Sequence, residues 1–148
     1  GGAACADGRC AGCRGRCGEA EIRGDRRPLL CTGRPSSVDE DMPSVFHRMG
    51  VHGAETEEVS YETDRMQCIG RARTTESPQA MTRAGALSGS EGSVLDPIVA
   101  IRHRITLDAG QAATIDVVSG IGETHAAALA LVGKYPDRQL ADRGFALA

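Results

Sequence analysis

The cysteines are the side chains whose type and spacing most readily suggest chemistry. Four of the six lie near the N-terminus in a C-x4-C-x2-C-x3-C pattern: Cys5, Cys10, Cys13 and Cys17. The first three match the spacing of a plant-type iron–sulfur loop, and Cys10 with Cys13 could supply half of a zinc site. No second C-x-x-C pair follows, and Cys31 and Cys68 lie in apolar sequence typical of buried thiols. We therefore expect no metal site.

The four histidines, His47, His52, His103 and His125, show no H-x-H or H-E-x-x-H spacing. His103 falls on the apolar side of an alternating segment, so we expect a hydrogen-bonded core histidine. Glu62 and Asp64 flank Thr63 and would share one face of an extended chain. Such a pair could cleave a glycosidic bond, but Arg65 beside it favours an exposed ion pair. We assign no catalytic residue.

Arginines supply the candidate binding site. Arg65, Arg71 and Arg73 surround Gly70, and the planar fork of a guanidinium suits phosphate and carboxylate groups. We take Arg71 and Arg73 as the candidate substrate-binding residues. The glycine-rich segment 88–93 lacks the lysine and the following helix of a phosphate loop, so we expect a flexible loop there.

Composition limits the class of protein. The chain has 148 residues, a net charge of -3, 41% hydrophobic and 25% charged residues, which is ordinary for one globular domain. The charge balance argues against nucleic acid as a partner. No stretch approaches the ~20 apolar residues of a membrane span. Residues 1–18 contain no large apolar side chain, so we expect them to be disordered.

Alternating polarity predicts four strands that would position these residues: 44–52, 57–63, 97–107 and 112–121. We expect the last two to form a β-hairpin through the Asp108–Gly110 turn, with Arg102 and Arg104 on its wet face. Residues 74–93 read as a long polar loop. Thr124 should cap a helix over 125–135, and a second helical run covers 137–147. The predicted class is mainly β, with helices last.

Two stretches resemble the cyclic β-1,2-glucan synthases, members of glycosyltransferase family 36 and glycoside hydrolase family 94. Residues 59–65 and 70–74, VSYETDR and GRART, resemble their "ETDR…FLGRGRT" segment. Residues 87–97, LSGSEGSVLDP, resemble "LSGTVGAVLDP", and residues 126–135 look like "EEALALADKY". The resemblance runs from about residue 21 to 148. Residues 66–69 and 123–125 depart from the family pattern.

The resemblance implies part of a β-sandwich, of the supersandwich type found in cellobiose phosphorylase, over residues 19–122, followed by linker helices over 123–148. In that family an (α/α)6 barrel carries the catalytic aspartate, and inorganic phosphate is the co-substrate of an inverting phosphorolysis. The chain is too short to hold that barrel, so we expect a non-catalytic domain without a bound cofactor. The parent enzyme would act on β-glucan in the cytoplasm, either as a soluble protein or as the soluble part of an inner-membrane protein.

A second hypothesis is a stand-alone carbohydrate-binding or interaction module. Such modules stack sugars on exposed aromatic rings, and this chain has few aromatics: Phe46, Tyr61, Tyr135 and Phe145. A part of a larger sandwich would also leave strand edges and apolar faces uncovered. We therefore expect residues 19–148 to self-associate when isolated.

Overall fold

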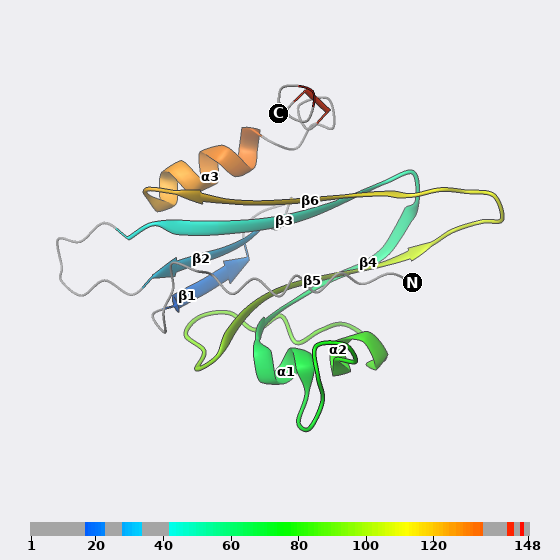
Figure 1. Ribbon diagram of the computed structural model, residues 1–148, viewed down its shortest axis with the longest axis horizontal. Coiled ribbons are helices and arrows are strands. Elements are labelled where there is room, and N and C mark those ends of the chain that lie inside the picture. The colour runs from blue at the N-terminus through cyan, green and yellow to red at the C-terminus, as the bar shows by residue number, and fades with distance from the viewer. Residues whose placement is uncertain (1–16, 23–27, 34–41, 135–141, 144–145, 147–148) are drawn as a thin grey trace.

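The computed structural model of the chain describes residues 17–22, 28–33, 42–134, 142–143 and 146. Figure 1 shows its strands and helices in chain order. The strands are β1 (Cys17–Ile22), β2 (Leu29–Gly33), β3 (Ser44–His52), β4 (Glu55–Asp64), β5 (Pro97–Thr106) and β6 (Thr114–Gly122). The helices are α1 (Arg65–Ile69), α2 (Gln79–Thr82) and α3 (His125–Lys134). The predicted class, mainly β with helices, is confirmed.

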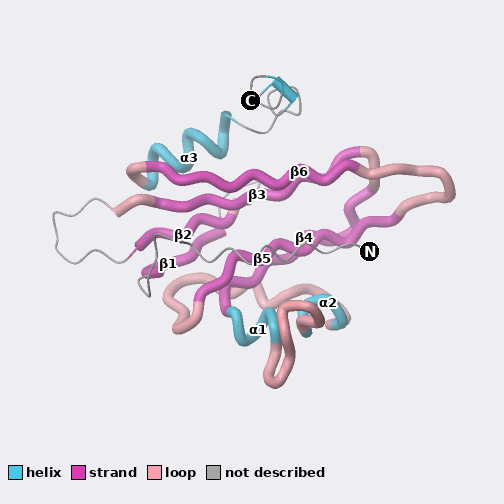
Figure 2. Tube along the Cα trace, in the orientation of Figure 1, coloured by secondary structure: helices cyan, strands magenta, loops and turns pink. Residues whose placement is uncertain are grey.

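The strands form two antiparallel sheets, which Figure 2 shows in the same orientation. The four-stranded sheet has the order β1-β2-β3-β6, and the two-stranded sheet pairs β4 with β5. Helix α3 packs on one face of the four-stranded sheet, while α1 and α2 pack beside the two-stranded sheet. The described residues therefore form layers of helix, sheet, sheet and helix.

Alternation along the strands builds the apolar core between these layers. Leu29 and Leu30 are adjacent and both fully buried, yet they face opposite sides because successive strand side chains alternate. Leu29 joins a cluster between the sheets with Met49, Tyr61 and Ile101. Leu30 joins a second cluster under α3 with Phe46, Ala128 and Val132. The four-stranded sheet is thus buried on both faces near β2 and β3.

The predicted pairing of residues 97–107 with 112–121 is wrong. Both segments are strands, and the turn at Ala109 and Gly110 exists. However, β5 pairs with β4, while β6 pairs with β3. The connection between them crosses from one sheet to the other instead of closing a hairpin. Alternation fixes which face of a strand is buried, but it does not select the neighbouring strand.

The chain also changes sheets between β3 and β4, through Gly53 and Ala54. Gly53 has a φ of +81°, and a Cβ atom there would lie 2.8 Å from the backbone oxygen of Ala112. The Gln111 side chain donates a hydrogen bond to the Gly53 carbonyl oxygen at 2.7 Å. The two crossovers are therefore fastened to each other at the same end of the sandwich.

Helix α3 begins as the sequence predicts. The Thr124 side chain accepts a hydrogen bond from the Ala127 amide at 3.1 Å, as an N-cap residue does. The second predicted run, 137–147, lies outside the described residues except for 142, 143 and 146. Of the predicted disordered segment 1–18, only residues 17 and 18 are described, and both belong to β1. Within the described residues, no helix combines the length and apolarity needed to cross a bilayer.

Substitution of Gly53 by alanine tests the crossover. We expect Gly53→Ala to lower the free energy of unfolding by about 1–3 kcal/mol, because the left-handed backbone is strained and the new methyl meets fixed backbone. Gly110→Ala is the matched control, since Gly110 has a φ of +83° but no atom within 4 Å of the place that a Cβ would take. Urea denaturation of both variants measures the difference, and equal losses would contradict the close approach at Gly53.

Candidate functional site

The candidate arginines lie in the turn that follows α1. The Asp64 carboxylate begins this helix by accepting a hydrogen bond from the Met66 amide at 2.8 Å. Gly70 ends it with a φ of +88°. Ala72 has a φ of +59°, rare for a residue with a side chain. The turn leaves Arg71 and Arg73 exposed on either side of Ala72.

Close packing against α2 fixes the position of this turn. A Cβ atom at Gly70 would lie 2.7 Å from the Gln79 side-chain oxygen, so a glycine allows the two helices to approach. The Arg73 guanidinium donates a hydrogen bond to the Thr82 hydroxyl at 3.3 Å. Beneath both helices, Cys68 and Ala80 are buried against Ile98 of β5. The turn that bears Arg71 and Arg73 is therefore supported by the packing of α1 and α2 on β5.

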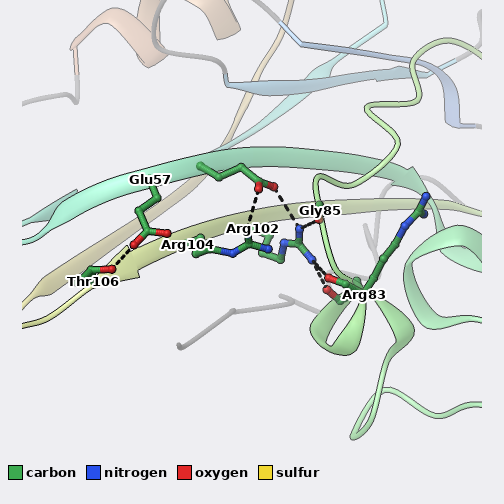
Figure 3. Close-up of polar contacts among 8 residues, drawn as sticks. Glu57, Arg83, Gly85, Arg102, Arg104 and Thr106 are labelled. Atoms are coloured by element: carbon green, nitrogen blue, oxygen red, sulfur yellow. Dashed lines mark hydrogen bonds and ion pairs between the residues drawn. The ribbon is translucent and has the colours of Figure 1, made fainter.

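Arg102 of β5 holds α2 and the following residues onto the sheet. Its guanidinium donates hydrogen bonds to the carbonyl oxygens of Ala80 at 2.7 Å, Arg83 at 3.1 Å, and Gly85. It also forms an ion pair with Glu58 at 3.2 Å. Figure 3 shows these contacts converging on one guanidinium. One cation thereby binds a carbonyl group of the short helix α2, the carbonyl of its C-cap residue and a carbonyl of the segment that follows.

The sequence-based prediction of a wet face at Arg102 is therefore wrong. Arg102 is only 8% exposed, whereas Arg104 on the same face is exposed. The cover comes from residues 74–93, which we expected to be an open polar loop. This segment contains α2 and buries Ala80 and Leu87. Ala80 and Leu87 are among the few apolar residues of this polar stretch, and they were the signal of that packing in the sequence.

Glu62 of β4 is a second buried charge on this face, fully shielded from solvent. Its carboxylate accepts hydrogen bonds from the Ser88 hydroxyl at 2.6 Å, from the Ser90 hydroxyl, and from the amides of Thr63 and Asp64, both at 3.1 Å. Burial would raise the pKa of Glu62, but these four bonds outweigh it and hold the pKa below the ordinary value of 4.5.

These contacts correct two predictions. Glu62 is not part of an exposed ion pair with Arg65, because Arg65 instead faces Asp96, with 3.8 Å between the charged atoms. Asp64 caps α1, so the two carboxylates do not act as a pair. The glycine-rich segment 88–93 is bound along the β4 edge, where the Gly89 amide donates to the Tyr61 carbonyl at 2.9 Å. It also bridges to β1 through Gly92 and Ala20.

The histidines and cysteines form no metal centre among the described residues, where no group of three ligating side chains occurs. Cys31 and Cys68 are buried thiols, as predicted. The cysteines at positions 5, 10 and 13 lie outside the described residues. His103 was predicted to be a hydrogen-bonded core histidine. Its Nδ1 atom is buried but has no hydrogen-bond partner among the described residues, so this part of the prediction is wrong. The His47 Nδ1 atom lies 2.6 Å from the Ser119 hydroxyl.

Two stacked antiparallel sheets with a short helical cover define the architecture as a β-sandwich. The sequence matches the glycosyl hydrolase 94 supersandwich domain over residues 4–138. The chain belongs to this family, which confirms the fold that the resemblance implied. The match begins within the cysteine-rich segment that the resemblance had excluded.

The chain is also similar to the cyclic beta-(1,2)-glucan synthase NdvB of Rhizobium meliloti (strain 1021). It is 33% identical to this chain over 80 residues, which are 54% of this chain and 3% of that protein. The similarity therefore covers a small part of a much longer protein. The roles of Arg71 and Arg73 as binding residues stay predictions, because neither the fold nor the relative tests them.

The Arg102 contacts can be tested by removing the guanidinium. We expect Arg102→Met to lower the free energy of unfolding by about 2–3 kcal/mol, because buried carbonyls lose a charged donor. Arg104→Met removes an exposed cation of the same strand whose partner among the described residues is Glu58, and should cost about 0.2–1 kcal/mol. Urea denaturation measures both losses, and comparable values would rule out a special role for Arg102.

Acid should weaken the fold in two stages. Burial lowers the pKa of His47 and of His103 below the ordinary 6.5, so the unfolded chain takes up protons first and stability falls as the pH drops from about 6.5. The lowered pKa of Glu62 adds a second loss below about 4.5. We expect His47→Gln with His103→Gln to flatten the first stage, and Glu62→Gln the second. The measurement is the urea unfolding free energy from pH 8 to pH 3.

Proposed function

We propose that this chain is a non-catalytic carbohydrate-binding or structural part of an enzyme that transfers glucosyl units or phosphorolyses β-linked glucan. Membership of the glycosyl hydrolase 94 supersandwich family carries the proposal, and the similarity to a cyclic β-(1,2)-glucan synthase supports the substrate class. Glu62 and Asp64, the one carboxylate pair considered for sugar chemistry, are used within the fold for burial and helix capping. The catalytic acid would come from the (α/α)6 barrel.

Within that enzyme, Arg71 and Arg73 would bind an anion, with inorganic phosphate as the co-substrate. In an inverting phosphorolysis an acid protonates the leaving oxygen while phosphate attacks the opposite face of the sugar. A phosphate approaching a carboxyl-lined site must be held against charge repulsion, and guanidinium groups do this with directed hydrogen bonds. The exposed arginine turn, supported by α2 and Arg102, suits this task.

The stand-alone module is the weaker alternative. Among the described aromatic residues, Phe46 is 3% exposed and Tyr61 is 6% exposed, so neither offers a face on which a sugar ring could stack. We propose instead that β-glucan and the barrel are partners within one enzyme, located in the cytoplasm or on the cytoplasmic side of the inner membrane. Isolated from them, the chain should self-associate through its uncovered apolar side chains.

Binding of inorganic phosphate and of β-1,2-linked glucose oligomers to the 148-residue chain tests the proposal. Amide chemical shifts followed by NMR should move in residues 70–74 on addition of phosphate. Arg71→Ala with Arg73→Ala should abolish these shifts. Arg83→Ala is the matched control, because Arg83 is an exposed arginine next to α2 whose contact with Arg102 is made by its backbone oxygen, which the substitution keeps.

Three results would contradict the proposal. Release of glucose 1-phosphate from glucan by this chain alone would mean that it is catalytic. Phosphate binding that survives in the double variant would remove the role of Arg71 and Arg73. Tight glucan binding that is independent of both arginines would favour the stand-alone module.

A further inference from the structure

The two exposed arginines of the candidate binding site differ in how their side chains are held. The Arg73 guanidinium donates a hydrogen bond from Nη1 to the Thr82 hydroxyl at 3.3 Å. Arg71 is exposed, and its guanidinium makes no hydrogen bond or ion pair with the described residues. An arginine side chain loses much conformational entropy when a ligand orders it. Arg73 is therefore in place before a ligand arrives, whereas Arg71 is not.

The Thr82 hydroxyl is itself fixed on α2. It donates a hydrogen bond to the Gln79 carbonyl oxygen at 3.3 Å, three residues earlier in the helix. A hydroxyl has one proton to donate, so its oxygen is left to accept the bond from Arg73. Helix α2 is in turn bound to the sheet by Arg102, which reaches the Ala80 carbonyl oxygen at 2.7 Å. The contact that holds Arg73 thus leads back to a buried side chain of β5.

The backbone turn around Ala72 sets the direction of the Arg73 side chain. The Arg73 amide donates to the Gly70 carbonyl oxygen at 3.4 Å and closes a β-turn. Ala72 is the third residue of this turn, and its φ of +59° is one that a residue with a side chain keeps only where its surroundings hold it. The Arg73 Cδ atom lies 3.5 Å from the place that a Cβ of Gly70 would take. The stem of Arg73 is therefore held beside Gly70 and its tip at Thr82.

The bond to Thr82 leaves free the part of Arg73 that an oxyanion needs. A guanidinium carries five N–H donors in a planar fork, and two phosphate oxygens can bind two of them side by side. Thr82 takes one donor, on Nη1, and no described residue bonds Nε or Nη2. Thr82 thus fixes the plane of the fork without occupying it.

We infer that Thr82 is a positioning residue for anion binding. Its hydroxyl holds the Arg73 guanidinium where Nε and Nη2 receive two oxygens of a phosphate, and Arg71 closes on the ligand afterwards. The inference rests on the proposed function for the identity of the ligand, and it adds the residue through which α2 sets the affinity of that site.

The order of the Arg73 side chain tests the positioning role without any ligand. In NMR relaxation of the full chain, we expect the Nε–H group of Arg73 to show a higher heteronuclear NOE than that of Arg71. Thr82→Val should lower the Arg73 value to that of Arg71, and Thr82→Ser should retain it. Thr75→Val is the matched control, because Thr75 is an exposed threonine whose hydroxyl bonds no described residue. Equal values for the two arginines in the unmodified chain, or a high Arg73 value that survives in Thr82→Val, would overturn the inference.

Titration with inorganic phosphate measures what this order contributes to binding. We expect Thr82→Val to weaken phosphate binding about three- to tenfold, the loss typical of one hydrogen bond. In a chain that already carries Arg73→Ala, Thr82→Val should cause no further loss. An equal loss in that background would mean that Thr82 does not act through Arg73, and would overturn the inference while the proposed function stands. Absence of any phosphate response in the unmodified chain would overturn both.

Discussion

Two buried charges of opposite sign hold the segment between β4 and β5 against the outer face of their own sheet. Arg102 binds it at Ala80, Arg83 and Gly85, while Glu62 binds it at Ser88 and Ser90. Burying a charge is costly unless hydrogen bonds replace the lost water; here the Arg102 guanidinium donates several and the Glu62 carboxylate accepts several. The segment of more than thirty residues between β4 and β5 has few apolar side chains to bury. Polar bonds to two ions replace the hydrophobic contacts that it lacks.

The sequence predicts the individual strands and helices well, but it predicts poorly which strands pair with each other. Alternation identifies residues 44–52 and 97–107 as strands, and Thr124 marks the start of α3, because these signals depend on adjacent residues. The partner of β5 depends on matching two apolar faces about forty residues apart, and a good turn at Gly110 suggested the wrong match. The two-sheet arrangement came from the family resemblance rather than from periodicity.

In the candidate site, too, the sequence predicted some of the residues and missed others. Arg71 and Arg73 were found from residue type and their place beside a glycine, and the fold does present them on the surface. Arg102 and Glu62 were missed as organising residues, because an arginine on the polar side of a strand normally faces water. Their role depends on cover from a segment about twenty residues away. The hydroxyls of Ser88 and Ser90, in a stretch predicted to be a flexible loop, were the unrecognised partners.

The crossovers at Gly53 and Gln111 make both sheets parts of one long ribbon. On one strand of the ribbon, β3 continues into β4 after two residues; on the other, β5 continues into β6 after seven. The ribbon folds over at this point, and the hydrogen bond from Gln111 to Gly53 closes the bend. Contacts such as Ser44 with Gly122 join residues far apart in sequence, which slows folding. Because both strands of the ribbon turn at the same place, the pairing of β3 with β6 and the pairing of β4 with β5 share one register, and a shift in one sheet would have to be matched in the other.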